Sequence, residues 1–205
     1  MRIVRTVGCF LLLGTAMLRA DDFGDVIPDD ATPVAFDLAA WCDVAGHRFV
    51  FEKTPLAEVI QALGGGKLQY IGDGGDATSY VDYSDGTHFI RFSSNDEMGG
   101  DDHALQGVEI RPLSASDQQK MLPRVTPPIR FPFGTLAIPL VGLTHELGHA
   151  NEHDGVRAYL YLRTAHDAAK DDNGKSLDLE TQSSLLVRTY GGKIVALSVN
   201  RVTSG

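Results

Sequence analysis

The stretch His145-Glu146-Leu147-Gly148-His149 has the residue types and the spacing of a catalytic metal site. If the stretch is helical, its two histidines lie one turn apart on the same face, where both imidazoles can hold one zinc ion. The glutamate beside the first histidine can then polarise a zinc-bound water as a general base. The motif therefore indicates zinc-assisted hydrolysis, with His145 and His149 as ligands and Glu146 as the catalytic base.

The motif resembles the zinc-binding helix of the zincin metallopeptidases, and this resemblance implies a small secreted zinc peptidase. Such an enzyme needs a third zinc ligand. His153 extends the histidine series, and Glu180 offers a carboxylate farther along the chain. Glu152 and Gly155, however, stand where the metzincin spacing requires a glycine and a histidine. The zinc peptidase is therefore the alternative interpretation of this chain.

The motif also falls within an internal repeat, which favours a different interpretation. Residues 55–64 align without gaps with residues 139–148, and the two segments share the proline, both leucines and the final glycine. The first copy ends in a run of three glycines, which stops a predicted helix. A second helix that stops likewise at Gly148 would leave His149 off the face that carries His145. This interpretation needs neither a cofactor nor catalysis.

Hydrophobic periodicity and turn residues predict short helices and antiparallel strands. Thr54 suits the N-cap of a helix over residues 55–63, whose apolar residues form one stripe. Asp85-Gly86 predicts a two-residue turn between strands 78–84 and 87–93, which would pair Val81 with Ile90 and bury both. The other predicted elements are a helix over residues 36–44 and strands over residues 47–51, 106–111, 157–163, 185–190 and 193–199.

The order of these elements predicts an α+β fold of two tandem modules, each with short helices packed on a three- to four-stranded antiparallel sheet. The first module covers residues 34–113 and the second covers residues 131–205, with a proline-containing linker over residues 114–130. Residues 1–20 have the positive start, apolar run and small residues of a signal peptide. Residues 21–33 are predicted to form an acidic N-terminal arm.

Charge and the predicted leader limit the partners of the chain. Its 27 acidic and 18 basic residues give a formal net charge of −9, which argues against nucleic acid as a partner. We expect a periplasmic or secreted protein, with no transmembrane anchor after the signal peptide is cleaved. An acidic surface favours a partner with a basic surface.

A helix that ends in Leu-Gly, followed by three antiparallel strands, resembles the module of the SmpA/OmlA outer-membrane lipoproteins and of the β-lactamase-inhibitor proteins, which carry two such modules in tandem. The resemblance covers residues 54–111 and 133–200. It implies that concave sheet faces bind another exported protein, with the chain acting as an enzyme inhibitor or an immunity protein. In the inhibitor family an aspartate at a hairpin tip contributes, and Asp85 matches that feature.

The residue types on the predicted outer sheet faces point to the same function. Tyrosine and arginine are enriched at the energetic hot spots of protein interfaces, and phenylalanine is common there. Aromatic residues also suit strands whatever their function, so both interpretations stay open. The predicted binding surface consists of Tyr80, Asp85, Phe89, Arg91, Arg157, Tyr159, Tyr161 and Arg163.

Overall fold

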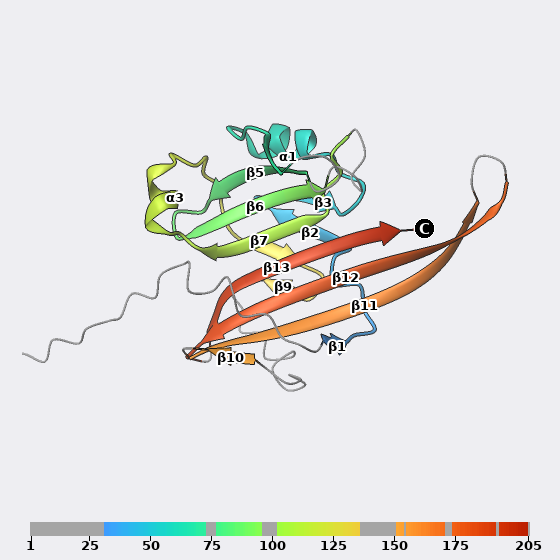
Figure 1. Cartoon of the computed structure of the whole chain (residues 1–205). Helices are drawn as coiled ribbons and strands as arrows, with labels where there is room; N and C mark the ends of the chain where they lie inside the picture. The colour runs from blue at the N-terminus through green and yellow to red at the C-terminus, as the bar shows by residue number, and fades with distance from the viewer. Residues whose placement is uncertain are drawn as a thin grey trace, which may run out of the picture.

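The computed structural model describes residues 31–72, 77–95, 102–135, 151–153, 155–170, 174–191 and 193–204. These residues form a large and a small β-sheet, with helices α1 (Leu56–Leu63) and α3 (Ala115–Gln119) at the edge of the large one (Figure 1). The predicted signal peptide, most of the predicted acidic arm and residues 145–149 lie outside the described residues.

The large sheet contains nine strands within the described part of the chain. They are β1 (Ala31–Pro33), β4 (Gln69–Ile71), β5 (Thr78–Ser84), β6 (His88–Asn95), β7 (Gly107–Pro112), β10 (Asn151–His153), β11 (Val156–Lys170), β12 (Ser176–Tyr190) and β13 (Lys193–Ser204). Their order is β1-β11-β12-β13-β7-β6-β5-β4, with β10 paired to another part of β11. The β1–β11 pair is parallel, and the other pairs of this sheet are antiparallel.

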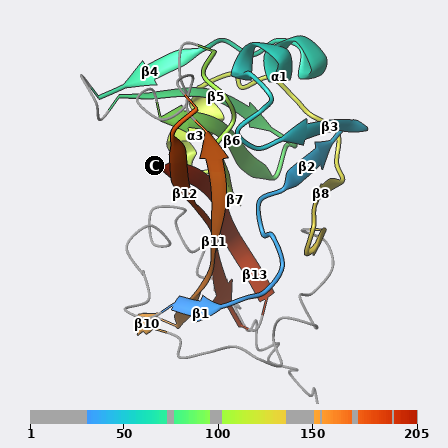
Figure 2. The same ribbon diagram turned by 90° about the vertical axis from the view of Figure 1, so that its right-hand side faces the viewer.

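The small sheet lies along one side of the large one (Figure 2). It consists of β2 (Trp41–Val44), β3 (His47–Val50), β8 (Ile129–Phe131) and β9 (Gly134–Thr135), in the order β3-β2-β8-β9. Phe49 of β3 meets Phe92 of β6 edge to face, with ring centroids 6.1 Å apart. Buried side chains from both sheets and from α1 form one hydrophobic core, which extends from Leu38 to Val199 along the chain.

This architecture shows that the predicted fold of two tandem helix-on-sheet modules was wrong. The chain is mostly strand, and α1 and α3 are the only helices among the described residues. Strand β7, from the first predicted module, pairs with β13, from the second, over residues 107–110 and 197–200. One sheet therefore continues through both halves of the chain. Residues 114–130, predicted as a linker, contain α3, the start of β8 and the buried side chain of Val125.

The predicted strands are confirmed, and β11 and β12 are longer than expected. The helix predicted over residues 55–63 is also confirmed as α1, and it ends at Gly64, whose φ of 72° suits a residue without a Cβ. Its N-cap is Pro55, and no side chain caps the helix. The Thr54 hydroxyl accepts a hydrogen bond from the Val50 N–H at 2.9 Å and does not cap the helix. The N-cap prediction for Thr54 was therefore wrong.

The helix predicted over residues 36–44 was also wrong. Residues 41–44 form β2, which pairs with β3 and β8 and buries Cys42 and Val44. These alternate residues face the core, and two flanking strands satisfy the backbone hydrogen bonds. Tertiary pairing thus decides the conformation of an apolar segment that is too short for its own periodicity to decide it.

The β5–β6 hairpin has the predicted faces with a shifted register. Val81 pairs with Phe92 and not with Ile90, because the turn residues are Gly86 and Thr87 in place of Asp85 and Gly86. Moving the turn by one residue shifts the register by two. Side chains alternate with a period of two, so this shift keeps every residue on its predicted face. Val81 and Ile90 are both fully buried, as expected.

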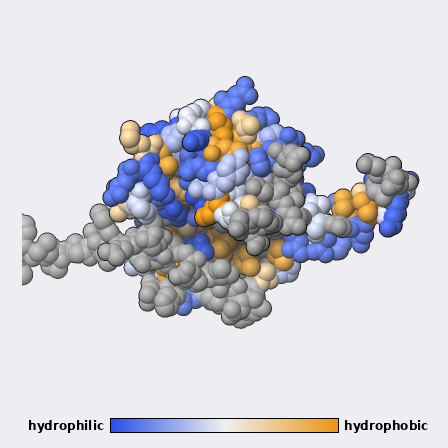
Figure 3. All heavy atoms as spheres, turned by 45° about the horizontal axis from the view of Figure 1, so that its top comes forward, coloured by the Kyte–Doolittle hydropathy of each residue, from blue (hydrophilic) through white to orange (hydrophobic). Residues whose placement is uncertain are grey.

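Strands β11 and β12 extend beyond β7 as an arm, defined here as the paired residues 164–170 and 176–182 (Figure 1). Its end, residues 167–170 and 176–179, lies beyond the pairing with β13. Ala165, Ala169, Leu177 and Leu179 of the arm lie on the face that is buried farther along β12. Figure 3 shows apolar residues among hydrophilic ones on this arm. The alternation of inward and outward side chains along β12 therefore continues into the arm.

We expect Gly66→Ala to destabilise the fold by about 2 kcal/mol, because the new methyl group would overlap the Tyr83 hydroxyl and lie 2.7 Å from Cγ2 of Val81. Tyr83→Phe should change stability by less than about 0.5 kcal/mol, because that buried hydroxyl has no hydrogen-bond partner among the described residues. In the Tyr83→Phe background, Gly66→Ala should cost less. Urea denaturation of the two single variants and the double variant measures this coupling, and strictly additive effects would contradict it.

Candidate functional site

The outer face of strands β5, β6 and β7 carries a layer of arginine, aromatic and acidic side chains, which we call the arginine–aromatic face. Alternation along each strand turns these residues away from the core. Cross-strand pairing places Asp82 opposite Arg91, Arg91 opposite Glu109, and Phe89 opposite Arg111. The face consists of Tyr80, Asp82, Phe89, Arg91, Glu109 and Arg111.

Arg91 is held in one position by a carboxylate and an aromatic ring. Its Nε and Nη2 donate hydrogen bonds to the two carboxylate oxygens of Asp82 at 2.8 and 3.0 Å. The guanidinium carbon lies 3.9 Å from the centroid of the Tyr80 ring. Burial by itself would lower the pKa of Arg91, but hydrogen bonding to Asp82 and its negative charge raise it above the ordinary value. The cation is thus rigid and permanently charged.

Arg111 has a similar environment at the next strand. Its guanidinium carbon lies 3.9 Å from the centroid of the Phe89 ring, so Phe89 is fully buried beneath it. Its Nη1 donates to Oδ2 of Asp117 at 2.5 Å, and its Nε lies 3.3 Å from a carboxylate oxygen of Glu109. The side chain of Arg111 nevertheless keeps 22% of its surface exposed, so it is both held and accessible.

Asp117 connects this face to helix α3. Its carboxylate accepts hydrogen bonds from the backbone N–H and the hydroxyl of Ser114. Its own backbone N–H donates to Ser114 Oγ at 3.1 Å, and the two backbone donors complete a capping box at the start of the helix. Burial alone would raise the pKa of Asp117, but hydrogen bonds from Arg111 and Ser114 and the charge of Arg111 hold it far below the usual range. The carboxylate stays ionised, so it can fix the position of Arg111.

Asp85 lies at the hairpin turn, but it does not point freely into solvent. Its Oδ1 accepts from the backbone N–H groups of Thr87 and His88 at 2.8 and 2.7 Å, and its Oδ2 accepts from Nδ1 of His88 at 2.9 Å. Burial would raise the pKa of Asp85, and these hydrogen bonds lower it below its ordinary value. The sequence indicated an acidic tip, and the structure shows an Asp85–His88 pair.

The four residues predicted on β11 share one face of the strand, and this face is directed toward the core. Tyr161 is buried, its hydroxyl has no partner among the described residues, and burial raises its pKa to about 12. Tyr159 packs against the core, and Arg163 is half-buried. Arg157 is exposed and donates to a Glu152 carboxylate oxygen at 2.8 Å. These four side chains therefore do not form one open surface.

The predicted metal ligands are not brought together in the described part of the chain. His145, Glu146 and His149 lie outside the described residues, and only the backbone of His153 is described, in β10. Glu180 lies on the arm opposite His166. No group of three metal-binding side chains occurs among the residues that the structure describes. The zinc alternative stays a prediction.

Metal analysis of the purified protein tests that alternative. A catalytic zinc site at residues 145–149 requires about one zinc ion per chain. Glu146→Gln should then keep the metal and abolish hydrolysis, because it removes the base and leaves both histidines in place. Protein purified from zinc-supplemented cells that contains no zinc would contradict this alternative.

Sequence reasoning missed Glu109, Arg111 and Asp117. The alternation of β7 places Glu109 and Arg111 on the same face, and this signal was available in the sequence. Ser114-Ala115-Ser116-Asp117 also fits a capping box. The contact between Arg111 and Asp117 depends on the turn that brings α3 back over β7, and local periodicity does not specify that turn.

Comparison with known proteins does not identify a relative of this chain. No protein-family model, curated protein sequence or solved structure is significantly similar to this chain. Among the described residues, no helix is long and apolar enough to span a membrane.

We expect Asp117→Asn to destabilise the protein by about 2–3 kcal/mol at pH 7, because it removes the ionic partner of a partly buried arginine. The folded-state pKa of Asp117 lies below the unfolded value, so its contribution is complete above the unfolded pKa and is lost as the pH falls toward the folded pKa. The stability difference between wild type and variant should therefore shrink between pH 7 and about pH 3. Urea denaturation at both pH values measures it.

Asp43→Asn provides the matched control. Asp43 also forms a bidentate pair with an arginine, Arg48, but the arginine side chain is 56% exposed. Water screens this pair, so its loss should cost clearly less stability than the loss of the Asp117 carboxylate. Equal losses in the two variants would contradict the role assigned to Asp117.

Proposed function

We propose that this chain is exported and acts by binding another exported protein through the arginine–aromatic face, as an enzyme inhibitor or immunity protein does. The observation that carries the proposal is the fixed position of two partly exposed arginines, Arg91 and Arg111, each stacked on an aromatic ring and hydrogen-bonded to a carboxylate. Arginine and tyrosine are the residue types that most often dominate binding energy.

The rigidity of these arginines favours recognition. An arginine that is ordered only on binding loses side-chain entropy at that moment, which weakens the complex. Arg91 has already lost this freedom in the folded chain, because Asp82 and Tyr80 hold it. The face can therefore present planar donors and ring edges to a partner at little further entropic cost.

Charge supports a basic partner. The two arginines are neutralised by Asp82, Glu109 and Asp117, so the face itself does not repel cations. The whole chain carries a formal net charge of −9. Long-range attraction to a basic protein would raise the association rate, and the paired groups on the face would supply specificity after contact.

Export is supported by the sequence of residues 1–20, with arginines before an apolar run and small residues after it. The partner should then be sought in the same compartment. Fusing residues 1–20 to a reporter enzyme that is active only outside the cytoplasm tests this part of the proposal without involving the binding face.

We expect immobilised protein to capture a basic protein from an extract of exported proteins, and Tyr80→Ala to weaken that complex by about tenfold or more. This variant removes the ring beneath Arg91 but leaves the Arg91–Asp82 ion pair, so no buried charge loses its partner. Biolayer interferometry with the purified partner measures the change in Kd.

Trp41→Ala is the matched control for this experiment. Trp41 also supports a stacked arginine, with the Arg48 guanidinium carbon 4.1 Å from its ring, but it lies on the small sheet. The control should leave Kd within about twofold of the wild-type value. A partner that binds Tyr80→Ala as tightly as wild type would show that the arginine–aromatic face is not the binding surface.

A further inference from the structure

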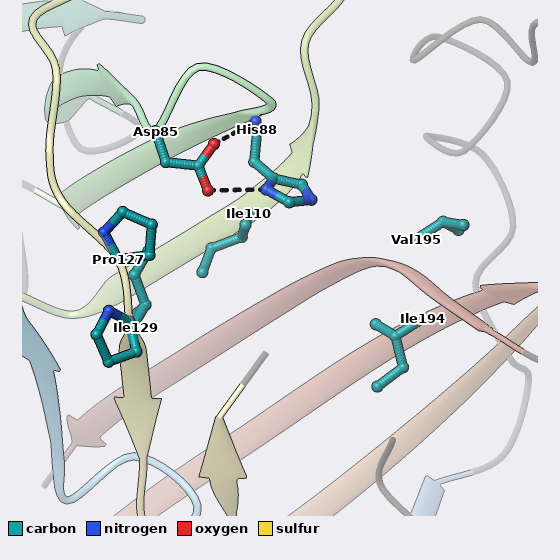
Figure 4. A pocket seen from close by; sticks show the side chains of 8 residues that line it. Asp85, His88, Ile110, Pro127, Ile129, Ile194 and Val195 are labelled. Atoms are coloured by element: carbon teal, nitrogen blue, oxygen red, sulfur yellow. Dashed lines mark hydrogen bonds and ion pairs between the residues drawn. The ribbon is translucent and has the colours of Figure 1, made fainter. Parts of the chain in front are cut away.

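A pocket of about 280 Å³ opens beside the β5–β6 turn. None of its lining residues belongs to the arginine–aromatic face. The turn forms one end of the pocket, the segment before β8 forms one side, and the start of β13 forms the other (Figure 4). Its lining residues are Asp85, His88, Ile110, Pro127, Pro128, Ile129, Ile194 and Val195.

The polar end of this pocket offers one hydrogen-bond acceptor in a defined position. Nδ1 of His88 lies 2.9 Å from a carboxylate oxygen of Asp85, and an ionised carboxylate only accepts hydrogen bonds, so Nδ1 carries the proton. In the neutral imidazole, Nε2 then holds the lone pair. Figure 4 shows Nδ1 on the side of the ring that faces Asp85 and the other ring nitrogen on the far side, toward the part of the pocket where Val195 lies.

Asp85 itself is poorly suited to bind a cation. Its two oxygens already accept three hydrogen bonds, from the backbone N–H groups of Thr87 and His88 and from the imidazole. Only 10% of its side chain is exposed. The carboxylate therefore orients His88 and makes this end of the pocket repel anions, while Nε2 is the atom available to a ligand.

The rest of the pocket is apolar. Ile110, Ile129, Ile194, Val195 and two prolines supply its walls. An apolar protein cavity of about 150 Å³ is large enough for benzene, so the volume here suits a molecule of one or two rings. Flat rings fit between proline and branched aliphatic side chains, where they are removed from water.

We propose that this pocket is a binding site for a free, uncharged aromatic molecule of one or two rings that carries a single hydroxyl or N–H donor. The ring lies between the isoleucines and the prolines, and the donor hydrogen-bonds to Nε2 of His88. The site is independent of the proposed protein-binding face, because Ile110 and Arg111 are adjacent on β7 and point to opposite sides of the sheet.

The test uses p-cresol, toluene and p-toluate, which share a methylated ring and differ in the polar group. Titrations of the purified protein are followed by the NMR shifts of the pocket methyl groups. We expect p-cresol to bind with a Kd of about 1 mM. Toluene should bind about fivefold more weakly, because it has no donor. The carboxylate of p-toluate should bind more weakly than p-cresol, because Asp85 repels it.

Variants then assign the contact to His88. His88→Phe keeps an aromatic ring but removes Nε2, so p-cresol and toluene should bind it equally. Ile194→Trp fills the pocket from the β13 side, because Ile194 lines the pocket and packs against the same core as Ile110, and it should abolish binding of both compounds. This variant gives a second readout if the turn does not tolerate phenylalanine. His166→Phe is the matched control, because His166 is 59% exposed on the arm and should leave the p-cresol affinity unchanged.

Three results would overturn the proposal. One is the absence of saturable shifts in the pocket methyl groups with p-cresol up to about 10 mM. Another is equal binding of p-cresol and toluene by wild type, or tighter binding of p-toluate. The third is tighter binding of N-acetyl-tyrosinamide than of p-cresol, which would assign the pocket to a tyrosine side chain of a partner protein. Because none of these titrations needs a protein partner, their outcome is separate from the test of protein binding.

Discussion

The pairing of β7 with β13 is the contact on which the rest of the structure depends. It joins strands from the N-terminal half to the long C-terminal hairpin in one sheet, and the small sheet then covers one face of it. Apolar side chains gather on the covered face. Charged side chains on the opposite face are partly removed from water and pair with one another or with helix α3, as Asp82 does with Arg91 and Asp117 with Arg111.

The two proposed sites are consequences of the same alternation. Consecutive residues on a strand point to opposite faces, so Arg111 belongs to the arginine–aromatic face while its neighbour Ile110 lines the pocket. On β6, His88 faces the pocket and Phe89 lies beneath Arg111. The β5–β6 hairpin thus provides a rigid polar surface on one side and the polar end of an apolar pocket on the other. The same two strands serve both sites.

The candidate site shows which predictions from the sequence hold in the folded chain. Tyr80, Phe89 and Arg91 do lie on one face, because the hairpin register is shifted by two residues and such a shift preserves the faces. Phe89 is buried by Arg111, however, and that cation comes from a strand whose pairing the hairpin alone does not specify. Tyr161 alternates with the apolar residues Leu160 and Leu162 and was therefore predicted on an outer face, but it belongs to the hydrophobic core and is only 2% exposed.

The amino-acid sequence by itself determined helix α1, the glycine that ends that helix, the two faces of the β5–β6 hairpin, and the positions of strands β3, β5, β6, β7, β11, β12 and β13. These features depend on interactions between residues a few positions apart, through backbone conformation and side-chain periodicity. Only the tertiary structure decided that β7 pairs with β13, that residues 41–44 are a strand and that the tip carboxylate of Asp85 is bound to His88. Such contacts depend on the pairing of distant strands and on turn geometry, for which many alternatives have equally good local patterns.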